Sequence, residues 1–127
     1  MSYRTIIITG GILGLLGVVL GAMGAHLLKD TIGPEFLGNY KTGAEYQMYH
    51  AVLLLFTGIA IKNNSSSLLK ISAVCTIAGV ILFSGSLYLL SITHNKALGM
   101  ITPFGGLAFM GGWVCMILHF LTKEKNS

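Results

Sequence analysis

Charged residues are scarce in this sequence. Its 127 residues include eight Lys and Arg and four Asp and Glu, so 9% of the chain is charged whereas 54% is hydrophobic. A soluble domain carries about a quarter charged residues because its surface faces water. With a mean hydropathy of +0.78, this chain has too little charge to cover a soluble globule. We therefore predict that lipid faces most of its exterior.

Other features are sparse or absent, and each absence excludes a class of protein. No basic cluster with interleaved aromatic residues is present, so we expect no nucleic-acid partner. The two cysteines, Cys75 and Cys115, are interpreted as packing residues rather than as a disulfide or metal pair. The long apolar runs lack polar–apolar alternation, which excludes a strand barrel. We find no internal repeat, and we treat residues 1–127 as a single domain.

Four apolar segments are each long enough to cross a bilayer, which takes about 20 residues of helix. They cover residues 6–28, 43–61, 68–92 and 103–121. The sequence therefore predicts an all-α, integral-membrane four-helix bundle. Thr102 and Pro103 suit the start of the last helix, as its cap and its first residue. The first segment is too long for a signal-peptide core of about 7–15 residues, and we expect it to be retained.

The first loop is predicted to contain a short interfacial helix. Pro34 suits the first position of a helix, and Glu35 then lies in the first turn, where the helix dipole favours an acid. Phe36, Leu37 and Tyr40 would share one side of this helix.

The distribution of Lys and Arg predicts the orientation in the membrane. With four spans, one face holds both termini and the second loop, with the basic residues Arg4, Lys62, Lys70, Lys123 and Lys125. The opposite face holds Lys29, Lys41 and Lys96. Because cytoplasmic loops carry the excess of basic residues, this distribution favours both termini in the cytoplasm.

Glycines recur at three- and four-residue steps along the first segment. They are Gly10, Gly14, Gly17, Gly21 and Gly24, and they form a seam on one helix face. Gly105 and Gly106 begin a second such surface in the last segment. Small residues let membrane helices approach closely. We interpret both surfaces as packing within the monomer, and the alternative is a homo-oligomer formed through the first seam.

Polar residues from all four segments are predicted to lie at similar depth near one membrane face. They form a candidate polar pocket: His26, Glu45, Gln47, His50, Ser84, Ser86, Tyr88 and Thr102. Ionisable residues inside a membrane are costly and therefore candidates for function. On one helix, Glu45 and His50 are about 140° apart, so they do not form an acid–base pair. His26 and the serines are the candidate partners of His50.

The pocket residues leave structural and chemical roles open. Neutral histidines that hydrogen-bond between helices would hold the helices together, whereas Glu45 and His50 could instead bind a ligand or transfer protons. His26, Glu45 and His50 are suitable ligand types for a metal, but no tight ligand motif accompanies them, so we expect no metal and no cofactor. Ser84 and Ser86 lack the strand–turn–helix elbow of a hydrolase nucleophile.

Four motifs resemble one known family: "GAMGAH", "TGAEYQMYHA", "FSGSLYLL" and "ITPFGG" with "GGW". The chain is identified as a member of the small bacterial membrane-protein family of unknown function number 423, also called the UPF0382 group. Human transmembrane protein 256 is similar. The resemblance implies an integral protein of the bacterial cell membrane and assigns no catalytic residue. Met23 stands where the family motif has Phe.

These observations lead to a functional hypothesis with two alternatives. We expect a non-enzymatic membrane protein whose outward-facing polar pocket binds a small molecule, a lipid headgroup or a partner helix. The first alternative is a small proton-coupled transporter or channel-like oligomer in which Glu45 and His50 titrate. The second is a membrane-embedded enzyme in which Glu45, His50 and a serine converge.

Overall fold

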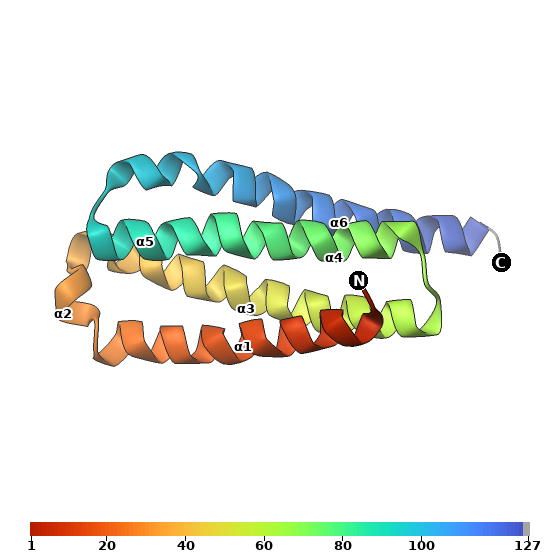
Figure 1. Ribbon diagram of the computed structural model, residues 1–127. Coiled ribbons are helices and arrows are strands. Elements are labelled where there is room, and N and C mark those ends of the chain that lie inside the picture. The colour runs from red at the N-terminus through yellow and green to blue at the C-terminus, as the bar shows by residue number, and fades with distance from the viewer. Residues whose placement is uncertain (126–127) are drawn as a thin grey trace.

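The computed structural model describes residues 1–125, and over that range the protein is helical and contains no strand. Four rods are long: α1 (Tyr3–His26), α3 (Pro34–Asn63), the continuous run of α4 (Ser67–Gly79), η1 (Val80–Ser84) and α5 (Gly85–Thr93), and α6 (Thr102–Lys125). Two short helices, α2 (Lys29–Ile32) and the 3₁₀ segment η2 (Lys96–Met100), connect them. The rods run side by side, with both termini at the end of the molecule opposite α2 (Figure 1). The all-α prediction is therefore confirmed for the described residues.

Three helices are long and apolar enough to cross a membrane. They are Tyr3–His26, Ser67–Thr93 and Lys96–Lys123, which correspond to the first, third and fourth predicted segments. The second predicted segment, residues 43–61, lies inside α3. At 30 residues α3 is the longest helix, but Glu45, Gln47 and His50 in its middle lower its hydropathy.

Serines cap two of the long helices, and a proline begins a third. The hydroxyls of Ser2 and Ser66 accept hydrogen bonds from backbone N–H groups in the first turns of α1 and α4. Pro34 begins α3, as its fixed φ favours. The predicted separate helix at Pro34 is wrong, because these residues form the first turns of α3 and continue without a break to Asn63.

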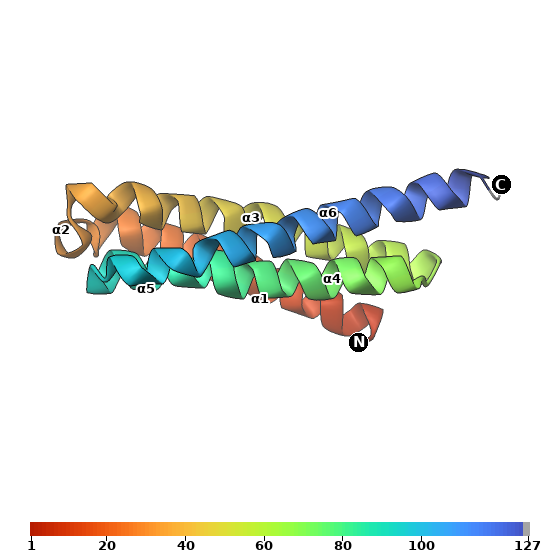
Figure 2. The same ribbon diagram turned by 90° about the horizontal axis from the view of Figure 1, so that it is seen from above.

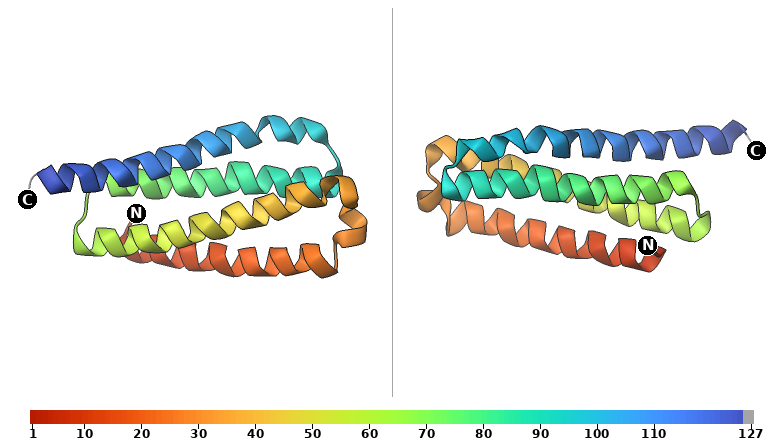
Figure 3. Two further views of the ribbon diagram at one scale, coloured as in Figure 1. Left: turned by 180° about the vertical axis from the view of Figure 1, so that it is seen from behind. Right: turned by 45° about the horizontal axis from the view of Figure 1, so that its top comes forward.

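The rods pack as a curved row rather than around a common axis. α1 packs mainly against α3, and α6 packs against α4 and η1. α1 and α6 therefore lie on opposite sides of the molecule (Figures 1 and 3). Seen from above, α6 runs obliquely from α5 toward the C-terminal end of α3 (Figure 2). This crossing places α6 beside α3 on one exterior face.

Glycines allow the closest helix contacts. A Cβ atom at Gly10, Gly17 or Gly24 of α1 would press against α3, whereas one at Gly14 would make an ordinary contact and one at Gly21 would meet open space. In α6, a Cβ at Gly105 would overlap the backbone of Phe83 in η1, whereas one at Gly106 would not. Packing within the monomer thus uses three of the five seam glycines and Gly105.

Candidate functional site

Gln47 connects three helices through its amide group. Its NH₂ group donates to the backbone oxygen of Leu13 in α1 at 2.8 Å, and its Oε1 accepts from the hydroxyl of Tyr88 in α5 at 2.6 Å. The side chain is 3% exposed. Each of these hydrogen bonds satisfies a polar group that would otherwise be unpaired in an apolar interior. Gln47 and Tyr88 therefore act as an interhelical connection.

The candidate serines also connect helices. Ser84 donates to the backbone oxygen of Gly43 in α3 at 2.7 Å. Ser86 lies 2.6 Å from the hydroxyl of Thr102 and donates to the carbonyl of Phe83 at 2.9 Å. Thr102 was predicted to cap α6 from outside the helix. Instead, α6 begins at Thr102 itself, and the Thr102 hydroxyl pairs with Ser86. These contacts join the α4–α5 rod to α3 through Ser84 and to α6 through Ser86 and Thr102.

His50 has both ring nitrogens engaged. Its Nδ1 lies 2.7 Å from the backbone oxygen of Tyr46, and the indole N–H of Trp113 in α6 donates to its Nε2 at 3.0 Å. An indole N–H can only donate, so Nε2 accepts and the proton resides on Nδ1. The ring also stacks on Phe109, with centroids 3.5 Å apart. These contacts define a neutral imidazole fixed between α3 and α6.

Two of the candidate pocket residues lie outside this cluster. Glu45 in α3 and His26 in α1 are both exposed on the outer surface of the protein. The suggestion that His50 pairs with His26 or with a serine is wrong, because Trp113 and the Tyr46 backbone occupy its nitrogens. The period of a single helix indicated that Glu45 and His50 point in different directions, but it did not indicate which of them faces inward.

A second set of polar contacts lies nearer the termini. Ser72 donates to the backbone oxygen of Gly112 at 2.7 Å, and Nδ1 of His119 lies 2.8 Å from the hydroxyl of Ser66. Thr76 donates to the Ser72 carbonyl of its own helix. Within residues 1–125, every buried side-chain nitrogen and oxygen has a hydrogen-bond partner. At both ends of the protein, the buried polar side chains therefore form hydrogen bonds with one another or with the backbone.

An aromatic groove lies beside His50 on the exterior face between α3 and α6. One part has a volume of about 520 Å³ and is lined by Tyr46, Met48, Tyr49, His50, Val52 and Trp113. An adjoining part of about 280 Å³ extends to η1 and α6 and shares Tyr46, His50 and Trp113 with the first. Pockets that bind small molecules have volumes of about 300–1,000 Å³ and are mostly apolar with a few polar groups. We call these two parts together the α3–α6 groove.

Sequence reasoning did not place Trp113 or Phe109 in a candidate site. Both residues lie in the fourth apolar segment, where their side chains resemble ordinary lipid-facing residues. Their spacing of four residues puts them on one face of α6, but only the crossing of α6 over α3 brings that face to His50.

Apolar helices joined by internal hydrogen bonds define this chain as an all-helical integral membrane protein. The chain belongs to the family described as "Protein of unknown function (DUF423)", whose model matches residues 20–106. The predicted resemblance is thereby confirmed.

Curated relatives cover nearly the whole chain. The UPF0382 inner membrane protein YgdD of Escherichia coli K12 is 38% identical over 126 residues, which is 99% of this chain and 96% of the relative. The UPF0382 membrane protein YwdK of Bacillus subtilis is 41% identical over 116 residues, covering 91% and 94%. A Staphylococcus aureus relative, UPF0382 membrane protein SAB0533, is 39% identical over 115 residues, covering 91% and 93%. No solved structure matches, and these names state no activity.

Proposed function

We propose that α3 is a fourth transmembrane helix and that both termini lie in the cytoplasm. In support, α3 runs the length of the molecule between α1 and the α4–α5 rod (Figure 1), and its polar Gln47 and His50 are buried between helices. The basic residues favour the terminal end as the cytoplasmic side.

Cysteine labelling tests this topology in intact bacterial cells. In a background with Cys75 and Cys115 replaced by Ala, an added Cys at exposed Asp30, in the loop before α3, reacts with a membrane-impermeant maleimide. An added Cys at exposed Asn64 reacts only after the membrane is opened. Reaction at Asn64 but not at Asp30 in intact cells would reverse the orientation, and reaction at both sites would show that α3 does not cross the membrane.

The protein binds a hydrophobic or amphipathic ligand in the α3–α6 groove and is not an enzyme. The observation that carries this function is the groove itself, with its aromatic walls and a fixed, neutral His50 at its side. His50 and the candidate serines are engaged in hydrogen bonds that hold the helices together, so they offer no free nucleophile or base beside the groove. Ser84 and Ser86, for example, donate to backbone carbonyls.

The membrane lipid is the most abundant ligand with this chemistry. Trp113 is 45% exposed and Val52 is 57% exposed, and both line the same part of the groove. Aromatic rings bury large apolar areas and have specific contact geometry, so a groove of this kind retains one chain longer than a smooth lipid-facing surface would. Bound lipid would then exchange slowly with bulk lipid.

Trp113 provides an internal probe of this binding because it is the single tryptophan of the chain. The protein is reconstituted into vesicles that contain a small mole fraction of a lipid brominated near the middle of its chain. If the groove retains lipid, quenching of Trp113 fluorescence exceeds the value for random mixing.

A matched pair of variants separates groove binding from general lipid exposure. Val52→Phe fills the groove, whereas Val114→Phe adds the same bulk on α6 at a residue that is 51% exposed and outside the groove. We expect excess quenching in wild type and in Val114→Phe, and its loss in Val52→Phe. Equal quenching in all three proteins, at the random-mixing value, would overturn the proposed function.

A further inference from the structure

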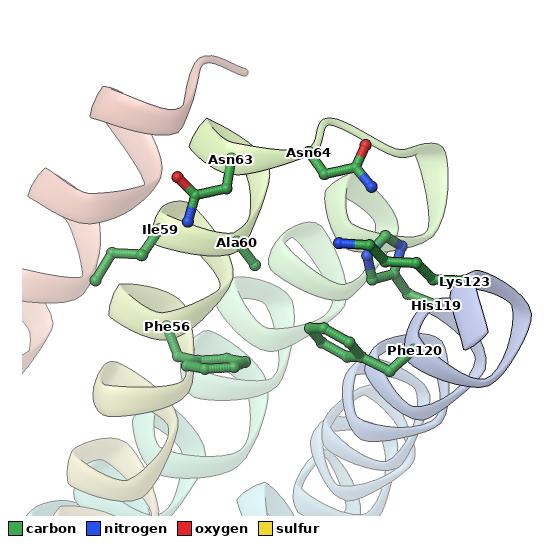
Figure 4. Close-up of a pocket in the computed structure, with 8 residues that line it drawn as sticks. All are labelled: Phe56, Ile59, Ala60, Asn63, Asn64, His119, Phe120 and Lys123. Carbon is green, nitrogen blue, oxygen red and sulfur yellow. The ribbon is translucent and has the colours of Figure 1, made fainter. Parts of the chain in front are cut away.

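A separate pocket, with polar residues at one end, continues the α3–α6 face toward the termini. It has a volume of about 170 Å³ and is lined by α3 residues that include Phe56, Asn63 and Asn64 and by α6 residues that include His119, Phe120 and Lys123. Figure 4 shows Phe56 and Phe120 on the side of the pocket toward the middle of the helices, with the two amides and the lysine closer to the helix ends. In the proposed four-span arrangement, the apolar side of the pocket faces the membrane centre and the polar side faces water.

The polar end offers hydrogen-bond donors and a positive charge. Lys123 is exposed, and within the described residues it forms no salt bridge. The imidazole of His119 is held through Nδ1 by Ser66, which leaves Nε2 as its remaining ring nitrogen. The side-chain amides of Asn63 and Asn64 add N–H donors. This donor set matches the oxygens of a phosphate group.

The surrounding charge favours an anion at this end. The basic residues Arg4, Lys62, Lys70, Lys123 and Lys125 lie near the start of α1, the end of α3, the start of α4 and the end of α6. These helix ends are at the end of the molecule that holds the termini (Figure 1), and by sequence Glu124 is the single acidic residue there. Basic pockets between membrane helices near a membrane surface are typical sites for the headgroups of acidic lipids.

The position of the pocket along α3 matches the depth of one lipid leaflet. Asn63 lies eleven residues after Val52, which is about 16 Å along a helix. Half of a hydrocarbon core of about 30 Å has nearly the same depth. Val52, Phe56 and Asn63 recur at helical spacing and so share one face of α3. An acyl chain that begins at the pocket would pass Phe56 and Phe120, whose rings are 6.3 Å apart, and end in the α3–α6 groove.

We propose that the ligand of the α3–α6 groove is an anionic phospholipid from the leaflet at the termini, with its phosphate bound by Lys123, Asn63 and Asn64. This inference rests on the proposed function for the position of the acyl chain. The phosphate pocket and the groove consist of different residues, so each can be disabled alone.

Native mass spectrometry of the delipidated protein, titrated with single phospholipids, tests this assignment. The probes are phosphatidylglycerol, which is anionic, and phosphatidylethanolamine, which is zwitterionic and has the same acyl chains. Wild type binds phosphatidylglycerol more tightly. Lys123→Gln weakens phosphatidylglycerol binding about fivefold, as expected for one basic residue at a lipid phosphate, and changes phosphatidylethanolamine binding little.

Lys125→Gln is the matched control, because it removes the same charge from α6 at a residue that does not line the pocket. It leaves both affinities close to wild type. Equal losses in Lys123→Gln and Lys125→Gln, or a wild type that does not discriminate between the two lipids, would overturn the phosphate site.

Val52→Phe distinguishes failure of the phosphate site from failure of the proposed function. If the inference is correct, this variant weakens binding of both lipids because it fills the groove. If Val52→Phe binds both lipids like wild type while Lys123→Gln still loses selectivity, the phosphate site stands and the assignment of the chain to the groove is wrong. If Val52→Phe weakens both lipids while Lys123→Gln equals wild type, the groove stands and the phosphate site is wrong.

Discussion

The hydroxyl of Tyr88 in α5 donates a hydrogen bond to Oε1 of Gln47 in α3 at 2.6 Å. The amide nitrogen of Gln47 in turn reaches the backbone of α1. α1 packs mainly against α3, and Gln47 links α1 to α5 through hydrogen bonds, although α1 and α5 make little direct contact. The stability of the helical row should therefore depend on this pair.

Removal of the Tyr88 hydroxyl should destabilise the protein modestly. Tyr88→Phe keeps the ring and deletes one interhelical hydrogen bond, which costs about 0.6 kcal/mol on average in membrane proteins and up to about 1.7. Gln47→Leu should cost more, because it deletes two hydrogen bonds and leaves the Tyr88 hydroxyl unpaired. Unfolding by steric trapping in bicelles measures both changes.

The double variant and a control complete that test. If the two side chains act together, Tyr88→Phe adds less destabilisation in the Gln47→Leu background than in wild type. Tyr49→Phe removes an exposed hydroxyl for which the structure shows no hydrogen bond and should be near neutral. Additive losses would contradict the direct contact.

The imidazole of His50 should be the neutral tautomer with its proton on Nδ1. The indole N–H of Trp113 requires an acceptor at Nε2, and the Tyr46 carbonyl then accepts from Nδ1. Nitrogen NMR of the labelled protein distinguishes the two ring nitrogens directly. In Trp113→Phe, the Nε2 signal should move because its donor is lost, while the signals of His119 stay in place. A proton on Nε2 in wild type would contradict the observed geometry.

Adjacent glycines in α6 should respond very differently to alanine. In Gly105→Ala, the added methyl group would overlap the backbone of Phe83, which cannot rotate away, and overpacking of this kind costs about 1–3 kcal/mol. In Gly106→Ala, the methyl group would make only an ordinary contact with the Phe83 ring. The free energy of unfolding of the two variants measures the difference, and similar values would show that α6 does not approach η1 this closely.

The α1–α3 contact makes a parallel prediction. Gly24→Ala would press a methyl group onto the ring of Tyr40, whereas the methyl group of Gly21→Ala would meet open space. Gly21→Ala should therefore be neutral or slightly stabilising, because Ala favours helix more than Gly does. Thermal unfolding in detergent compares the two. Equal destabilisation would mean that Gly21 also contacts another helix, and a dimer through the seam would then become the explanation.

The ion pair between Lys96 and Glu35 should contribute little. The Nζ–Oε1 distance is 3.3 Å, but both side chains are largely exposed, and pairs of this kind contribute about 0–1 kcal/mol. Glu35→Gln should change the free energy of unfolding by less than about 1 kcal/mol, with a smaller effect in high salt. A larger loss that persists in high salt would indicate that the pair is shielded from water.

Sequence patterns predicted the helical elements well because each pattern is local. Apolar length predicted the positions of the long helices, and the fixed φ of Pro34 predicted that a helix begins there, although that helix is α3 itself rather than a separate one. The separate interfacial helix was wrong for a physical reason as well. Tyr40 and Gly43 pack on α1 and α5, so the helix that begins at Pro34 continues through residues expected to form a loop boundary.

The sequence by itself determined that this is a helical membrane protein, because charge content and the lengths of apolar runs do not depend on how helices pack. It also determined that Glu45 and His50 point apart, since the helical period sets that angle. Only the tertiary structure decided which residue is inside. α6 crosses α3 at His50 and provides Trp113 as its donor, while Glu45 is left exposed. The direction in which a side chain points from its own helix is a local property, but its burial requires a second helix to cover it. For His50 that helix is α6, and the close packing of Gly105 against Phe83 helps to set where α6 lies.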